Sequence, residues 1–187
     1  MGKEITEKKT FMGNIIINKT WAMPSGNTFT IPPVREFVER EVNYCTKWEG
    51  VIIDPFANNC KYGTVTNDLN PEYGTTFCMD ALKFLESLRS GTADLVLYDP
   101  PYSMTQAAQL YRSYGRERLE VNAANMRYWK LCKDNVARIL RQGGVCLSFG
   151  WNSNGLGKGR GFEMAEILLV SHGGSKNDTI CCKEYKL

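Results

Sequence analysis

An apolar run that stops at an acid and two prolines most constrains the fold of this chain. Residues 95–98 read Leu-Val-Leu-Tyr, a short continuous run that is typical of a strand covered on both faces in a parallel sheet. Residues 99–102 then read Asp-Pro-Pro-Tyr. Pro100 has no N–H and a fixed φ, and it pushes Asp99 toward extended geometry, so the chain leaves the sheet as a stiff, non-helical segment. Because parallel sheets bind ligands at the carboxyl ends of their strands, we expect a functional site here.

The rest of the chain alternates strand-like and helix-like patterns. Helices are expected from Pro32-Pro33 through Val42, over 81–88, and over 129–142 with a stop at Gly143-Gly144. Strands are expected at 51–54, 64–68, 76–79, 95–98 and 145–150, and in a final pair around the turn at 172–178. This order predicts an α/β, doubly wound, mostly parallel sheet with a C-terminal antiparallel hairpin strand.

Length and composition are those of an ordinary globular protein. The chain has 187 residues, 43% of them apolar and 23% charged, which suits a single domain over 1–187 with residues 1–20 at its periphery. No apolar run approaches the roughly 20 residues of a membrane helix, and no signal-peptide core follows the Lys-rich start. We therefore expect a cytoplasmic protein without a membrane partner. The net charge of +3 permits an anionic partner without requiring one.

Metal binding is not expected. The seven cysteines are odd in number and include no C-x-x-C pair, and His172 is the only histidine. Reduced thiols that pack as small apolar groups explain the cysteines.

Three acids follow successive expected strands before the Asp-Pro-Pro-Tyr segment. They are Asp54, Asp68 and Asp80. In a doubly wound sheet an acid at the end of the second strand suits a ribose diol, and an acid at the third suits an exocyclic amine. Each acid alone is also explained as a helix cap or turn residue. Three in succession, followed by Asp99, favour a ligand site.

These segments resemble the S-adenosylmethionine-dependent DNA amino-methyltransferases, of the adenine-specific D-P-P-Y type. Residues 99–102 match the catalytic tetrapeptide of that family, and "DPFAN" at 54–58 resembles its cofactor loop, usually written D-P-F-x-G-x-G. "NDLNPEY" resembles the second-strand motif, "NTFTIPPVREF" the segment that closes over the methionine end, and "SHGGSKNDTI" the terminal hairpin. The resemblance covers about residues 21–187 and implies a Rossmann-like methyltransferase sheet.

The resemblance implies S-adenosylmethionine as cofactor and assigns two groups of residues. The cofactor-binding group is Asp54, Pro55, Phe56, Ala57, Asp68, Leu69, Asp80, Ala81, Thr30 and Ile31. The catalytic group is Asp99, Pro100, Pro101 and Tyr102. An aromatic amine is a poor nucleophile because its lone pair is delocalised, and two acceptors, the Asp99 carboxylate and the Pro100 carbonyl, would make it more tetrahedral. Tyr102 would stack on a base flipped out of the duplex.

The chain departs from the family pattern in the cofactor loop and in length. Asn58 and Asn59 stand where glycines are expected, although Asn tolerates positive φ, and too few residues follow for a full first crossover helix. No separate target-recognition domain is visible. We expect the segments 103–127 and 152–161 to choose the target. The candidate substrate contacts are Tyr102, Ser103, Trp151, Lys158 and Arg160, with core packing as the alternative for the tryptophan and a solvated surface for the two cations.

The sequence thus predicts a DNA methyltransferase acting on N6 of adenine. The alternatives are an RNA or protein amide methyltransferase and a catalytically silent member that binds nucleic acid or a partner. The compact chain favours a phage or mobile-element origin, in a bacterial or phage-infected cell, and a homodimer is compatible with it.

Overall fold

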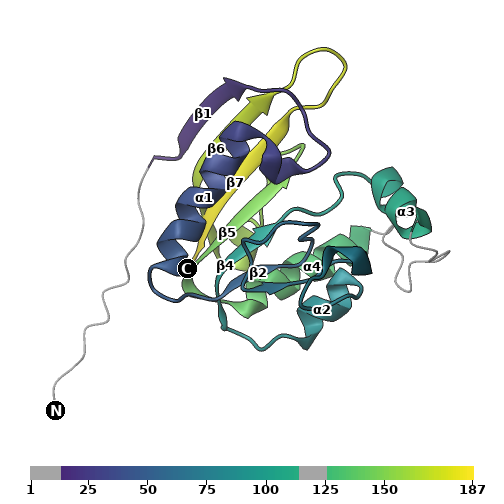
Figure 1. The fold of residues 1–187 in the computed structure, drawn as a ribbon. Coiled ribbons are helices and arrows are strands. Elements are labelled where there is room, and N and C mark those ends of the chain that lie inside the picture. The colour runs from purple at the N-terminus through teal and green to yellow at the C-terminus, as the bar shows by residue number, and fades with distance from the viewer. Residues whose placement is uncertain (1–13, 114–125) are drawn as a thin grey trace.

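A twisted mixed sheet organises the molecule (Figure 1). The computed structural model describes residues 14–113 and 126–187, and within this part the sheet has seven strands in the order β1-β6-β7-β5-β4-β2-β3. All neighbouring strands are parallel except where β7 pairs with β5 and β6, so β7 alone is reversed and the predicted topology is confirmed. The strands are β1 (Ile16–Trp21), β2 (Ile52–Asp54), β3 (Val65–Thr66), β4 (Ala93–Tyr98), β5 (Leu140–Gly150), β6 (Phe162–Ser171) and β7 (Thr179–Lys186).

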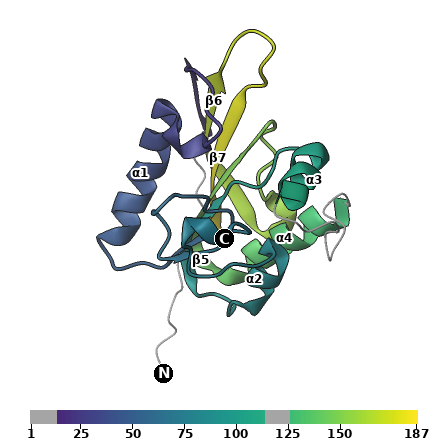
Figure 2. The same cartoon turned by 45° about the vertical axis from the view of Figure 1, so that its right-hand side comes forward.

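Helices cover both faces of the sheet. α1 (Pro32–Thr46) lies on one face, and α2 (Ala81–Ser87) and α4 (Met126–Ile139) lie on the other (Figure 2). Alternate residues of β4 point into the two layers: Leu95 and Leu97 pack in the cluster that contains α1, and Val96 and Tyr98 in the one that contains α2 and α4. The 95–98 segment is therefore buried on both faces, as its continuous apolar sequence predicts.

The connection from β2 to β3 is unusually short. These parallel strands pair directly, and residues 55–64 between them form no helix, so the prediction of a missing crossover helix is confirmed. β3 lies on one side of β2 and β4 on the other, so the direction of winding changes at β2. Such switch points are the ligand sites of doubly wound sheets.

The segment 76–79 is not a strand, and that prediction was wrong. Phe77 makes a single parallel bridge to Asn67. The hydroxyls of Thr66 and Thr76 explain the irregularity, because each accepts the backbone N–H of the other residue at 3.2 Å and 3.0 Å. Side chains thus take hydrogen bonds that a regular ladder would give to the backbone.

Two helix predictions also need correction. α4 ends at Ile139, and Gly143 and Gly144 lie within β5, so they do not supply the helix stop. The polar stretch after residue 102 contains a further helix, α3 (Met104–Ser113). The remaining short elements are the 3₁₀ turns η1 (Thr28–Thr30), η2 (Pro71–Tyr73) and η3 (Lys158–Arg160).

None of the helices within 14–113 and 126–187 is both long and apolar enough to span a bilayer. The same residues hold no group of three or more potential metal ligands. All seven cysteines lie in the described residues and are free thiols, as predicted.

Candidate active site

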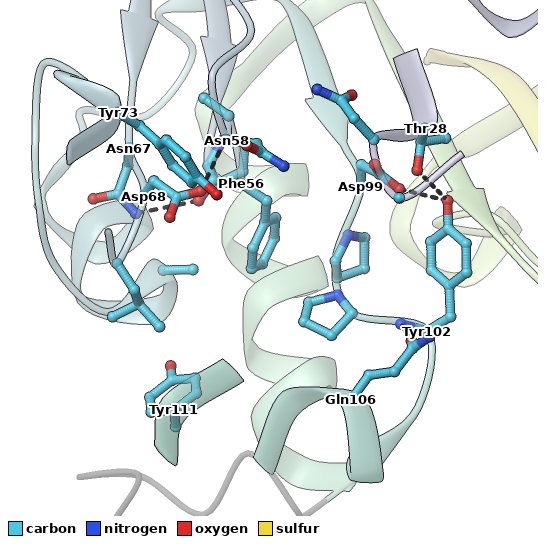
Figure 3. A pocket seen from close by; sticks show the side chains of 18 of the residues that line it. Thr28, Phe56, Asn58, Asn67, Asp68, Tyr73, Asp99, Tyr102, Gln106 and Tyr111 are labelled. Carbon is cyan, nitrogen blue, oxygen red and sulfur yellow. Dashed lines mark hydrogen bonds between the residues drawn. The ribbon is translucent and has the colours of Figure 1, made fainter. Parts of the chain in front are cut away.

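A cavity of about 590 Å³ opens at the carboxyl ends of β2, β3 and β4. Its size is typical of small-molecule and cofactor sites. Asp68 lies at one end and Asp99 at the other, with Phe56 between them (Figure 3). Ten of the predicted residues line it: Pro55, Phe56, Ala57, Asp68, Leu69, Ala81, Asp99, Pro100, Pro101 and Tyr102.

Asp68 is held just after the carboxyl end of β3 by hydrogen bonds from two backbone N–H groups. Its Oδ2 accepts the N–H of Asn58 at 2.8 Å, and its Oδ1 accepts the N–H of Asn70 at 2.9 Å. Asn58 makes this turn with a φ of 53°, in the left-handed region that glycine usually supplies. Each carboxylate oxygen keeps acceptor capacity for a ligand hydroxyl.

Asn67 fixes the cavity wall. Its buried side chain donates to the carbonyls of Pro55 at 3.1 Å and Met79 at 3.0 Å, and its Oδ1 accepts the N–H of Met79. The loop after β2 and the segment before α2 are therefore tied to the end of β3. From the sequence, Asn67 is identified only as the first residue of the "NDLNPEY" motif, with no role of its own.

At the other end of the cavity, Tyr102 turns back onto Asp99. Its hydroxyl donates to Asp99 Oδ1 at 2.7 Å and lies 3.0 Å from the hydroxyl of Thr28 in η1 (Figure 3). Burial raises the pKa of Asp99 to about 6, against the opposing effect of hydrogen bonds from Tyr102 and Thr28. The ring of Tyr102 meets Trp151 edge-on, with centroids 5.9 Å apart. Tyr102 therefore contacts the carboxylate of Asp99 in this state.

Asp54 lies beneath the cavity and does not line it, contrary to the prediction of a direct contact. It is fully buried at the end of β2, where its Oδ1 accepts the N–H of Phe56 at 3.1 Å. Its Oδ2 has no hydrogen-bond partner among the described residues. Burial raises the pKa of Asp54 well above its ordinary value, and the negative charges of Asp99 and Asp68 add to this effect.

The cavity is acidic and lacks cations. Two carboxylates line it and a third lies below, and no Lys, Arg or His of the described residues lines it. Inside such a cavity a phosphate group is disfavoured and a positively charged group is favoured.

Asp80 is not available as an amine acceptor. Its Oδ1 caps α2 by accepting the N–H groups of Leu82 and Lys83, and its Oδ2 accepts the hydroxyls of Tyr111 at 2.5 Å and Tyr128 at 2.9 Å. The helix-cap interpretation is thus correct for this acid. The two tyrosines line the cavity together with Trp129, and sequence reasoning missed all three.

Thr30 and Ile31 do not line the cavity. The hydroxyl of Thr30 bonds to Ser25 and to the carbonyl of Asn27, and Ile31 is buried in the cluster around α1. The residues just before them, 25–29, line the cavity instead. The segment named for the methionine end therefore reaches the cavity through the residues before Thr30, and not through Thr30 and Ile31.

The remaining substrate candidates lie outside the cavity. Ser103 caps α3, its Oγ accepting the N–H of Gln106 at 3.1 Å. Trp151 and Lys158 are exposed on the loop after β5, and Trp151 reaches the site only through Tyr102. Arg160 is bonded to Asp134 at 2.8 Å and to the carbonyl of Leu156, which makes it a structural residue in this state. Residues 114–125 of the predicted target-choosing segment lie outside the described residues.

Comparison of the whole fold with solved structures finds methyltransferases whose fold is similar to that of this chain. The N-methyltransferase NodS from Bradyrhizobium japonicum WM9, solved in complex with S-adenosyl-L-homocysteine, aligns over 83% of this chain and 88% of its own, with 11% sequence identity and a TM-score of 0.51. The fold is that of a Rossmann-like methyltransferase. TrmN from Thermus thermophilus aligns over 84% of this chain with 15% identity and a TM-score of 0.55, and the alignment spans about half of TrmN, 49%.

Sequence comparisons add no closer relative. No protein-family model matches the chain, and no curated protein sequence matches it. At these identities the structural likeness establishes the fold alone, so chemistry must be argued from the site.

Proposed function

We propose that the protein is an S-adenosylmethionine-dependent methyltransferase that acts on the exocyclic amine of a nucleobase, with N6 of adenine in DNA as its substrate. The observation that carries the proposal is a single cavity, at the switch point of a methyltransferase fold, that holds Asp68 at one end and Asp99-Pro100-Pro101-Tyr102 at the other. The chemistry of the two ends matches the two reactants.

The cofactor end fits a cationic nucleoside. Asp68 has free acceptor capacity for ribose hydroxyls, and Leu69, Phe56 and Met79 supply apolar surface for a base. The two carboxylates of the lining, Asp68 and Asp99, and the absence of cations from the described lining favour a positively charged methionine moiety. When bound, the cofactor would supply an electrophilic methyl group on a sulfonium.

The other end fits an amine. The carboxylate of Asp99 and the carbonyl of Pro100 would each accept one N–H, which localises the nitrogen lone pair toward the methyl group. The two prolines restrict the backbone that carries this carbonyl. After transfer the nitrogen must lose a proton, and Asp99, whose pKa burial raises to about 6, lies in position to take it.

The tetrapeptide at 99–102 is the reason for proposing DNA adenine over other amines. Aspartate in its first position leans the family resemblance toward adenine, since serine is commoner in the cytosine enzymes. The base would be reached by flipping, with the exposed Trp151 and the aromatic ring of Tyr102 at the entrance.

The deciding experiment is mass spectrometry of nucleosides from cells that express the protein and are fed methyl-deuterated methionine. Deuterated N6-methyldeoxyadenosine supports the proposal, with Asp99→Ala as the matched control that should abolish it. Label in cytosine, in RNA or in protein would show that the substrate is that molecule and not DNA adenine. No label in any of them would favour a catalytically silent protein. Calorimetry of the purified protein with S-adenosylhomocysteine, at micromolar to millimolar concentration, tests the cofactor separately.

A further inference from the structure

The hydroxyl of Tyr102 occupies an oxygen of the carboxylate that the proposed reaction needs. It donates its only proton to Asp99 Oδ1 at 2.7 Å. The hydroxyl of Thr28, 3.0 Å away, must therefore donate to the oxygen of Tyr102. The result is a directed chain of hydrogen bonds from Thr28 through Tyr102 to Asp99.

Thr28, the first residue in this series of hydrogen bonds, is held in place by its neighbours. It begins η1, whose cap Asn27 accepts the N–H of Phe29 and donates from Nδ2 to the side chain of Asn59 at 2.8 Å. Phe29 is buried with its ring edge-on to Phe149, at a centroid distance of 5.0 Å. The position of the Thr28 hydroxyl is thus fixed both by the core and by the loop after β2.

Tyr102 is also held from its own side. Its backbone N–H donates to the side chain of Gln106 at 2.9 Å, and its ring meets Trp151 edge-on with an interplanar angle of 73°. A tyrosine that only stacks on a base would need none of the hydroxyl contacts. The hydroxyl therefore has a use of its own.

We infer that Thr28 is a positioning residue, which holds the hydroxyl of Tyr102 on Asp99 Oδ1, where it competes with the target amine for that oxygen. The inference rests on the proposed function for the identity of the competitor. A base whose amine binds at Asp99 Oδ1 has to compete there with the hydroxyl of Tyr102. Thr28 thereby sets how readily Tyr102 leaves Asp99 Oδ1, so that this oxygen can accept the amine.

The pKa of Asp99 provides a measurement of this series of hydrogen bonds. The hydroxyls of Tyr102 and Thr28 lower the pKa of Asp99 against the larger effect of burial. The other titratable groups that interact with Asp99 electrostatically are Asp54 of β2 and Cys181 of β7, and neither changes when a hydroxyl is removed. Loss of either hydroxyl should therefore raise the pKa of Asp99.

The first arm of the test needs no cofactor and no nucleic acid. Protein labelled with ¹³C at the aspartate carboxyls is titrated by NMR, with Asp99→Asn to assign the signal. Tyr102→Phe and Thr28→Val should each raise the midpoint for Asp99, and Thr28→Ser, which keeps a hydroxyl, should restore it. Thr30→Val is the matched control, because the Thr30 hydroxyl bonds to Ser25 and Asn27 and not to this chain. An unchanged midpoint in Thr28→Val would overturn the role of Thr28, and should that variant not fold, Tyr102→Phe decides on the contact.

The second arm tests competition in methyl transfer to unmethylated genomic DNA. The KM for DNA should fall about three- to tenfold in Tyr102→Phe and in Thr28→Val, the range expected when a hydrogen bond that opposes binding is removed. A KM that stays constant or rises would overturn the competition. Wild-type protein with the expected titration but no transfer to DNA would instead overturn the proposed function, and the competition with it.

Discussion

The backbone N–H of Asn58 donates to Asp68 Oδ2 at 2.8 Å. This bond joins the loop after β2 to the acid after β3, so the two parts of the proposed cofactor site form one unit. The loop makes the contact without the glycines that the family pattern has, because Asn58 itself takes a positive φ of 53°. Cofactor affinity should therefore depend on the backbone of this residue.

Asn58→Ala should lower both stability and cofactor affinity. A Cβ-bearing residue without a polar side chain disfavours the left-handed region by about 1–2 kcal/mol, and relaxing the turn would move the N–H away from Asp68. Asn58→Gly should keep the turn and bind at least as well. Chemical denaturation and calorimetry measure the two effects, and an alanine variant equal to wild type in both would contradict this account of the loop.

Asp68 and Asp99 should separate binding from chemistry. Asp68→Ala should weaken S-adenosylhomocysteine by about 1.5–3 kcal/mol, or about ten- to a hundredfold, the range for hydrogen bonds to a charged group. Asp99→Ala should bind the cofactor normally and lose turnover even at saturating cofactor, because an interaction made mainly in the transition state has gone. Calorimetry and single-turnover transfer distinguish the two. Near wild-type turnover in Asp99→Ala would mean that the tetrapeptide is a stiffened turn.

The sequence predicted the sheet and the position of the cavity because both depend on local patterns. The continuous apolar residues 95–98 indicated a strand buried on both faces, and its Asp-Pro-Pro-Tyr ending indicated the strand end at which the cavity opens. α3 could also have been found, since Ser103 and Gln106 have the S-x-x-Q spacing of a capping box.

Contacts between distant residues could not be predicted in this way. From the sequence, Asp80 is interpreted as a ligand-binding acid. In the structure its Oδ2 accepts the hydroxyls of Tyr111 and Tyr128, which are 31 and 48 residues away. Thr28 reaches Tyr102 over 74 residues, and no local pattern marks it. A sequence pattern places an acid at the end of a strand, but only the packing of other elements decides whether that acid faces a ligand or a neighbour.

Asp80→Ala should reduce stability more than it affects cofactor binding. The variant loses the cap of α2, worth about 1 kcal/mol, and removes the acceptor of two buried tyrosine hydroxyls. Because these hydroxyls lie 3.4 Å apart and one can donate to the other, a single hydroxyl is left without an acceptor, at about 1–3 kcal/mol. We expect a loss of about 2–4 kcal/mol in the free energy of unfolding, measured with urea. A variant as stable as wild type but unable to bind cofactor would restore Asp80 as a ligand residue.

Asp99 should give methyl transfer an acidic limit near pH 6. The carboxylate must be ionised to accept an amine N–H, and burial raises its pKa to about 6, so the rate at saturating substrates should fall as the pH drops through 6 and reach about one-tenth one unit lower. Stability should respond in the opposite sense. Because the folded protein holds the proton to a higher pH than the unfolded chain, whose aspartates titrate near 3.9, the stabilising contribution of protonated Asp99 is lost as the pH rises from about 4 to about 6.

Asp99→Asn is the matched variant for the stability measurement. Urea denaturation between pH 4 and pH 7 should show a weaker decline in stability than in wild type, although not a flat profile, because the pKa of the buried Asp54 is raised as well. Asp178→Asn is the control, since this acid bonds to Ser171 and His172 at the far hairpin. A wild-type rate that stays constant down to pH 5, together with identical stability profiles for wild type and Asp99→Asn, would show that Asp99 titrates as an ordinary exposed acid.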